Sequence, residues 1–161
     1  MRRRVKSAPV GSELKLLLAA HQFYLAAELC DRRSTPDGSA WLIYPEVVNR
    51  AFACELALKG LIAGHSKVLA YGHDLKELFG MLPSTIQDHL RWPDIPVALF
   101  EERLHQVKDT FELWRYAHEW NSLTVSVQFL RKLAIAAIDA LHGQAAPSAI
   151  MLKSIEPQEF F

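Results

Sequence analysis

The chain has 161 residues, half of them hydrophobic, which is enough apolar material for one continuous core. Lys and Arg together number 18, and so do Asp and Glu, so the composition excludes a strongly basic or strongly acidic protein. Any contact with nucleic acid, an anionic membrane or an acidic partner must therefore be local.

A basic segment opens the chain. Residues 1–11 carry three consecutive arginines and a lysine but no small-residue cleavage pattern, so we expect a basic flexible tail rather than a signal peptide. No stretch approaches the roughly 18 uncharged apolar residues that a membrane span requires. We therefore expect a soluble protein without membrane contact.

Two long helices are predicted in the first half of the chain. The first covers residues 12–32, because Ser12 can cap it and apolar side chains recur at three- and four-residue steps. Turn-forming residues at 33–39 predict a loop. The second helix covers residues 45–63 and ends at Gly64. It is apolar over most of its circumference, so we expect it to be the central helix.

Two short helices are predicted next. One begins at His73 or Asp74 and ends before Pro83. The other covers residues 84–91, with Ser84 as its cap.

The second half of the chain predicts two further long helices. Apolar residues alternate at steps of four and three from Pro96 to His118, which indicates a helix with a seam facing the bundle. A break at residues 121–122 separates it from a last helix over residues 123–143. Residues 144–161 have weak periodicity and are expected to form a C-terminal tail.

The sequence contains no strand-like alternation and no repeat of fixed period. It therefore predicts an all-α fold, a helical bundle of four longer helices plus one or two short ones. This single domain covers residues 12–143 and lies between the two tails.

Cysteine and histidine positions argue against metal and cofactor chemistry. Cys30 and Cys54 lie in apolar helical stretches without metal-ligand spacing, which predicts buried free thiols and a cytoplasmic location. The scattered histidines lack a cysteine or carboxylate at ligand spacing, so no zinc site is expected. No glycine loop typical of phosphate binding occurs, and we expect no cofactor.

Arg115 and His118 are the candidate catalytic residues. They are three positions apart, which makes them neighbours on one helical face. Arginine can hold a phosphate and histidine can move a proton near neutral pH, as metal-independent RNA cleavage requires. The alternative is structural, because His118 also falls on the apolar seam and Arg115 can pair with a carboxylate such as Glu55.

Glu55, Lys59 and His73 form a second candidate group. Glu55 and Lys59 lie one turn apart on the second helix, and a buried Glu55 would need a cationic partner. Arg115 is the partner that we favour. Two structural alternatives remain open: a solvated pair of Glu55 with Lys59, and His73 as a simple helix cap.

Three segments of the chain resemble the HEPN domains (higher eukaryotes and prokaryotes nucleotide-binding). They are residues 51–62 (AFACELALKGLI), 71–79 (YGHDLKELF) and 111–116 (FELWRY). Their order and spacing match that family. With the helical frame, the resemblance covers roughly residues 12–142.

The resemblance implies an antiparallel helical bundle that forms a homodimer. Active HEPN members are metal-independent endoribonucleases of toxin-antitoxin, phage-defence and RNA-processing systems, whereas other members are inactive binding or accessory modules. Arg115 matches the arginine of the active members. Those members place more residues between this arginine and their histidine than the two that separate Arg115 from His118. Glu55 and His73 match further family positions and are expected to line the same cleft.

The resemblance therefore leads us to expect a HEPN-like module that binds RNA or a nucleotide. If the module is catalytically active, we expect a metal-independent endoribonuclease. The expected substrate-binding residues are Glu55, Lys59, His73 and Tyr116. The alternative function is a catalytically inactive accessory or scaffold protein, whose partner would be a protein such as a nucleotidyltransferase-like protein.

Overall fold

A computed structural model describes residues 5–33, 35 and 42–145. Over these residues the chain is mostly helical, and the predicted all-α helical bundle is confirmed. Most of the predicted loop at 33–39, the first four residues of the N-terminal tail and residues 146–161 of the C-terminal tail lie outside the described residues. No described helix combines the length and the apolar character needed to cross a membrane.

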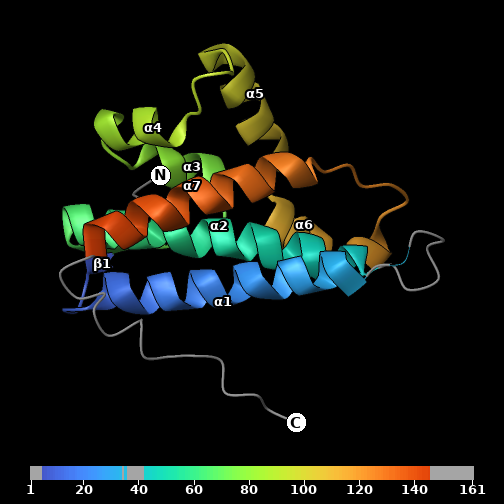
Figure 1. The fold of residues 1–161 in the computed structure, drawn as a ribbon, viewed down its shortest axis with the longest axis horizontal. Helices are drawn as coiled ribbons and strands as arrows, with labels where there is room; N and C mark the ends of the chain where they lie inside the picture. Colours follow the sequence, from blue (N-terminus) through green and yellow to red (C-terminus); the bar gives the residue numbers. More distant parts are fainter. Residues whose placement is uncertain (1–4, 34, 36–41, 146–161) are drawn as a thin grey trace, which may run out of the picture.

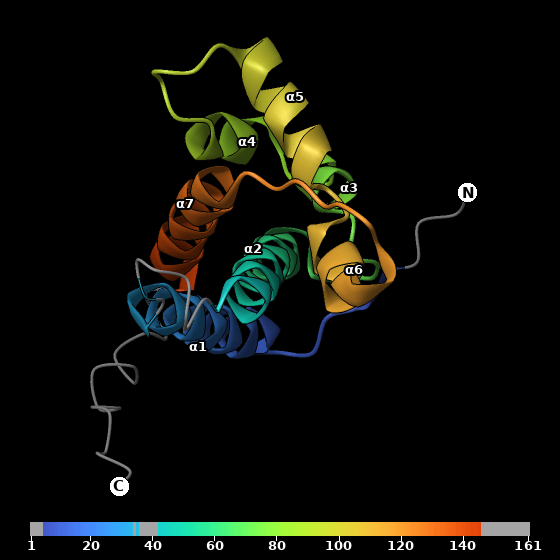
Figure 2. The same ribbon diagram turned by 90° about the vertical axis from the view of Figure 1, so that its right-hand side faces the viewer.

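Three long helices make up the body of the bundle. They are α1 (Ser12–Arg33), α2 (Ile43–Ser66) and α7 (Val127–Ala145), and they lie side by side in Figure 1. The end-on view in Figure 2 places α2 between α1, α7 and α6 (Thr110–Arg115). The expectation that the second helix is central is thus confirmed.

Small residues let α2 pack closely against its neighbours. A Cβ at Gly60 would overlap the Leu141 side chain and come within 3.3 Å of Leu16 Cβ. Gly64, predicted to end the helix, instead lies inside it, where an added Cβ would meet Gln144 at 2.8 Å. The helix ends after Ser66, where Lys67 adopts a left-handed backbone conformation and donates its N–H to a carbonyl of the last turn.

The prediction of one continuous helix from Pro96 to His118 is wrong. The chain forms α5 (Val97–Val107), then α6, then a 3₁₀ turn, η1 (Ala117–Glu119). At the break, the Lys108 carbonyl oxygen accepts the N–H of Leu75 at 2.9 Å, which ties the junction between α5 and α6 to the start of α3.

The two short helices occur where they were predicted. In α3 (Leu75–Gly80), Asp74 is the N-cap and accepts hydrogen bonds from the next two free backbone N–H groups. In α4 (Ser84–Leu90), Pro83 rather than Ser84 precedes the first turn.

A small two-stranded sheet was not predicted. Strand β1 (Val5–Ser7) pairs antiparallel with β2 (Val68–Ala70), which directly follows α2. For these three residues the expectation of a flexible tail is therefore wrong. Three residues are too few to show the alternation by which a strand is recognised in a sequence.

A buried ionic network joins the three long helices. Arg50 of α2 is only 1% exposed, donates to Glu28 of α1 at 2.7 Å and to Glu46 one turn earlier at 3.0 Å. Glu28 also accepts from Arg131 of α7 at 2.7 Å. Burial raises the pKa of Glu28, but the hydrogen bond and charge of Arg50 outweigh burial and hold this pKa below its ordinary value.

Replacing Arg50 should be severely destabilising. Arg50→Met leaves two buried carboxylates without their shared cation, and we expect the free energy of unfolding to fall by about 3–5 kcal/mol. Urea denaturation measures the loss. Arg131→Met is the matched control, because its more exposed side chain should contribute about 1 kcal/mol or less. Equal losses for the two variants would contradict the importance assigned to Arg50.

The same network predicts acid sensitivity. Because the pKa of Glu28 is lower in the folded chain than its ordinary value of 4.5, its contribution to stability is complete above pH 4.5. That contribution is lost as the pH falls through the lower folded value. Urea midpoints recorded from pH 7 to pH 3 should fall, and Glu28→Gln should flatten the lower part of this curve. An unchanged slope in the variant would contradict the linkage.

Candidate functional site

A buried carboxylate lies at the base of the candidate site. Glu55 is on the side of α2 that faces α6 and the loop before α3, and its side chain is 1% exposed. One carboxylate oxygen accepts from Lys59 Nζ at 2.6 Å, and the other contacts His73 Nδ1 at 2.9 Å. A buried carboxylate is costly unless it is paired, and here two donors from different segments pair it.

His73 is presented by the loop between β2 and α3. Gly72 before it has φ of 100°, a conformation that favours glycine, and the Asp74 cap after it begins α3. Because the Glu55 carboxylate has no proton to donate, the proton of the hydrogen bond belongs to His73 Nδ1. In the neutral ring, Nε2 is then the acceptor, on an imidazole that is 37% exposed.

Aromatic rings connect this pair to Arg115. Phe111 of α6 stacks on Phe52 of α2 with ring centroids 4.5 Å apart, and the His73 ring lies 5.3 Å from Phe111. The Arg115 guanidinium carbon lies 4.4 Å over the Phe111 ring. Since Phe52 covers one face of Phe111, Arg115 takes the other face.

Arg115 does not pair with Glu55, so the partner favoured from the sequence is wrong. Its side chain is exposed, and its only contacts within the described ranges are with the rings of Phe111 and, at 5.5 Å, Tyr116. No hydrogen bond or ion pair joins it to another described residue. The reason is geometric, because Lys59 and His73 already supply a donor to each oxygen of Glu55. The guanidinium donors of Arg115 therefore face solvent.

His118 lies apart from this group. It follows the end of α6 in η1, its side chain is 77% exposed, and its nearest charged neighbour is Glu119 at 3.8 Å. No hydrogen bond, ion pair or ring contact joins it to Arg115, Glu55 or His73 in the part of the chain described. The predicted shared helical face is lost because α6 ends at Arg115, and the predicted position of His118 in the apolar seam is also wrong.

The site thus contains five of the six residues predicted for it, and one that was missed. Phe111 is the ring that both His73 and Arg115 contact, and the sequence pattern identified it only as a core residue. The sequence spacing does indicate the contact of Phe111 with Arg115, since these two residues are one turn apart on a helix. The contact of Phe111 with His73, in contrast, joins segments 38 positions apart, which periodicity does not register.

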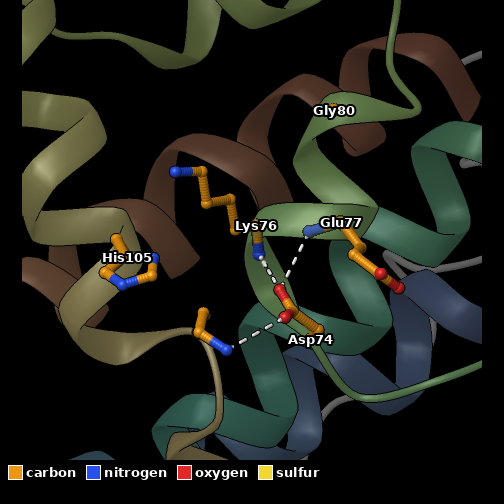
Figure 3. Close-up of a pocket in the computed structure, with 6 residues that line it drawn as sticks. Asp74, Lys76, Glu77, Gly80 and His105 are labelled. Atoms are coloured by element: carbon orange, nitrogen blue, oxygen red, sulfur yellow. Dashed lines mark hydrogen bonds and ion pairs between the residues drawn. The ribbon is translucent and has the colours of Figure 1, made fainter.

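The surface hollow beside this site has a different character. A cavity of about 420 Å³ lies between α3 and α5 and is lined by Asp74, Lys76, Glu77, Gly80, His105 and Lys108. The Asp74 carboxylate accepts hydrogen bonds from two backbone N–H groups in the first turn of α3 and from the Lys108 ammonium. The Asp74 carboxylate in this hollow is therefore already paired. In Figure 3, the Glu77 side chain points away from His105.

Two further observations concern metals and thiols. Among the residues that the structure describes, no group of three or more His, Cys, Asp or Glu side chains is placed to hold a metal ion. Cys54 is fully buried, its Sγ contacts the Leu130 carbonyl oxygen at 3.2 Å, and burial raises the pKa of its thiol. Cys30 is only partly buried, so the prediction of a buried thiol is wrong at this position.

No family model, no curated protein and no solved structure matches this chain. The chemistry of the site must therefore be argued from its own geometry. That geometry combines a cation open to solvent, an imidazole held by a buried carboxylate, and a ring that both of them contact.

The tautomer of His73 is directly measurable. We expect long-range ¹H–¹⁵N NMR to show a proton on Nδ1 of neutral His73, because Glu55 accepts it. Glu55→Leu removes the acceptor and should abolish this preference, while the exposed His118 provides an internal control. A neutral His73 protonated on Nε2 in the unaltered protein would contradict the hydrogen bond.

Proposed function

We propose that the chain is an RNA-binding module that holds a backbone phosphate at Arg115, beside His73 and Lys59. The observation that carries this proposal is the state of Arg115. Its guanidinium is exposed, rests on Phe111, and has no carboxylate partner within the described residues. Planar donors held in this way suit the oxygens of a phosphate.

The charges around Arg115 favour an anion. Glu55 is the buried acid of the site, and the Lys59 ammonium 2.6 Å away balances it. Arg115 then adds a positive charge that these two residues do not neutralise. A local positive charge on a chain of zero net charge fits the expectation that contact with nucleic acid is confined to one place.

Exposed aromatic side chains near Arg115 favour an RNA with unpaired bases. Tyr116 contacts the guanidinium, and Tyr116 and Trp120 are each about half exposed. Exposed rings can stack on unpaired bases, whereas the bases of a duplex are already stacked on each other. Single-stranded RNA is therefore the proposed ligand, with Tyr116 as a base-contacting residue.

The protein partners expected from the HEPN resemblance stay predictions. A homodimer or a complex with a nucleotidyltransferase-like protein would cover apolar side chains that are exposed in the single chain. Leu25 and Leu29, one turn apart on α1, and Ile135 on α7 are side chains of this kind. Among the described residues no hydrogen bond, ion pair or ring contact joins Arg115 to His118, so the proposal does not assign RNA cleavage to this pair.

Binding to single-stranded RNA tests the proposal. With EDTA present, a fluorescent RNA oligonucleotide should bind, and Arg115→Ala should raise its Kd by roughly tenfold, as expected for loss of a charged hydrogen-bonding group. The slope of log Kd against log salt concentration should fall by about one. Fluorescence anisotropy measures both quantities.

Arg103→Ala is the matched control for this experiment. Arg103 is an exposed arginine on α5, so its removal changes the net charge of the protein by the same amount. It should leave the Kd close to that of the unaltered protein. Equal weakening by both variants, or no binding of RNA at all, would overturn the proposed site.

A further inference from the structure

We propose that a second hollow, between α4 and α7, binds a small primary amine with an aliphatic chain, whose ammonium group pairs with Asp139. This site is separate from the one proposed for RNA. In Figure 2, α7 and α6, which carries Arg115, lie on opposite sides of the central helix α2. The inference therefore does not depend on RNA binding.

The size and the floor of this hollow suit a small molecule. Its volume is about 450 Å³, which falls within the roughly 300–1,000 Å³ typical of small-molecule sites. Its floor is apolar, because Leu61 of α2 is 1% exposed and is flanked by the partly buried Ile86 of α4 and Ala140 of α7. An aliphatic chain placed on this floor would be removed from water, which favours its binding.

The charge of the hollow favours a cation. Asp139 of α7 lines it with an exposed carboxylate that makes no hydrogen bond or ion pair with another described residue. Among the described residues, no lysine or arginine lines the hollow. His89 of α4 adds a ring that accepts a hydrogen bond when it is neutral. An ammonium group has three donors and no acceptor, so it matches these groups.

Gln144 supplies a further acceptor. It lines the hollow, and its side-chain Oε1 is buried without a hydrogen-bond partner among the described residues. A buried acceptor without a donor is costly. Rotating the amide toward the hollow loses no hydrogen bond of this oxygen and gains one from the ligand. Gln144 also lies in the last turn of α7, where the helix carries partial negative charge that favours a cation.

The surroundings of the hollow favour a free amine over a lysine side chain of another protein. The core of a protein interface uses large apolar or aromatic side chains as anchors. Among the described residues, none of the exposed large hydrophobic side chains lines this hollow. We therefore assign the hollow to a small molecule.

The experiment uses the full chain and n-pentylamine as the probe, an alkylamine that is protonated at pH 7. A titration followed by ¹H–¹⁵N NMR should give saturable shifts of amide signals in α4 and the last two turns of α7. We expect a Kd of the order of 1 mM, as suits a ligand of a few heavy atoms. 1-Pentanol, which has the same chain without the charge, should bind roughly fivefold more weakly.

Two variants test the acceptors. Asp139→Asn removes the charge with little change of shape and should raise the Kd for n-pentylamine roughly fivefold. Gln144→Leu should raise it about threefold through loss of a neutral hydrogen bond. Asp94→Asn is the matched control, because Asp94 is an exposed acid in the loop between α4 and α5 and does not line the hollow. It should leave the Kd unchanged.

The contrary outcomes are distinct. Absence of saturable shifts in α4 and α7, or equal weakening by Asp139→Asn and Asp94→Asn, would overturn the inference. Equal affinity for 1-pentanol would overturn recognition of an amine. A lysine capped at both ends carries the same ammonium group on a protein side chain, and tighter binding of this probe than of n-pentylamine would overturn the assignment to a free amine. None of these outcomes bears on the proposed RNA binding.

Discussion

Two buried charges on the central helix organise the molecule. Arg50 and Glu55 are five residues apart on α2, which places their side chains about 140° apart around the helix axis. Each is 1% exposed, and a buried charge is tolerated only when it is paired. Arg50 obtains its partners from α1 and from α2 itself, and Glu55 obtains its own from α2 and from the loop before α3. The pairing requirement therefore anchors different segments to opposite sides of one helix.

The candidate site follows from the Glu55 side of this arrangement. The buried carboxylate holds His73 and Lys59, and the Phe52 ring on the same helix supports Phe111. Arg115, one turn beyond Phe111, rests on that ring and keeps its hydrogen-bond donors open to solvent. A cation supported by rings and not by a carboxylate retains its capacity to bind an anion, which is why the proposed function centres on it.

Much of the fold, and part of the site, could be predicted from the sequence. Helix positions follow from apolar spacing, so the sequence predicts the three long helices and a short helix that begins at His73 or Asp74, and the structure assigns its cap to Asp74. The resemblance to HEPN domains grouped Glu55, His73 and Arg115, and the structure brings these three residues to one place. Their contacts with each other, and the exclusion of His118 from the group, could not be derived from that grouping.

The sequence by itself determined where most of the helical segments lie and which helix is central, because both depend on the local alternation of apolar and polar residues. Only the tertiary structure decided the partner of each buried charge and the point at which the helix predicted from Pro96 to His118 breaks. The Lys108 carbonyl bonds to Leu75, and Glu55 pairs with His73 rather than Arg115. Such choices depend on distances between segments far apart in the chain, and periodicity within one segment contains no information about them.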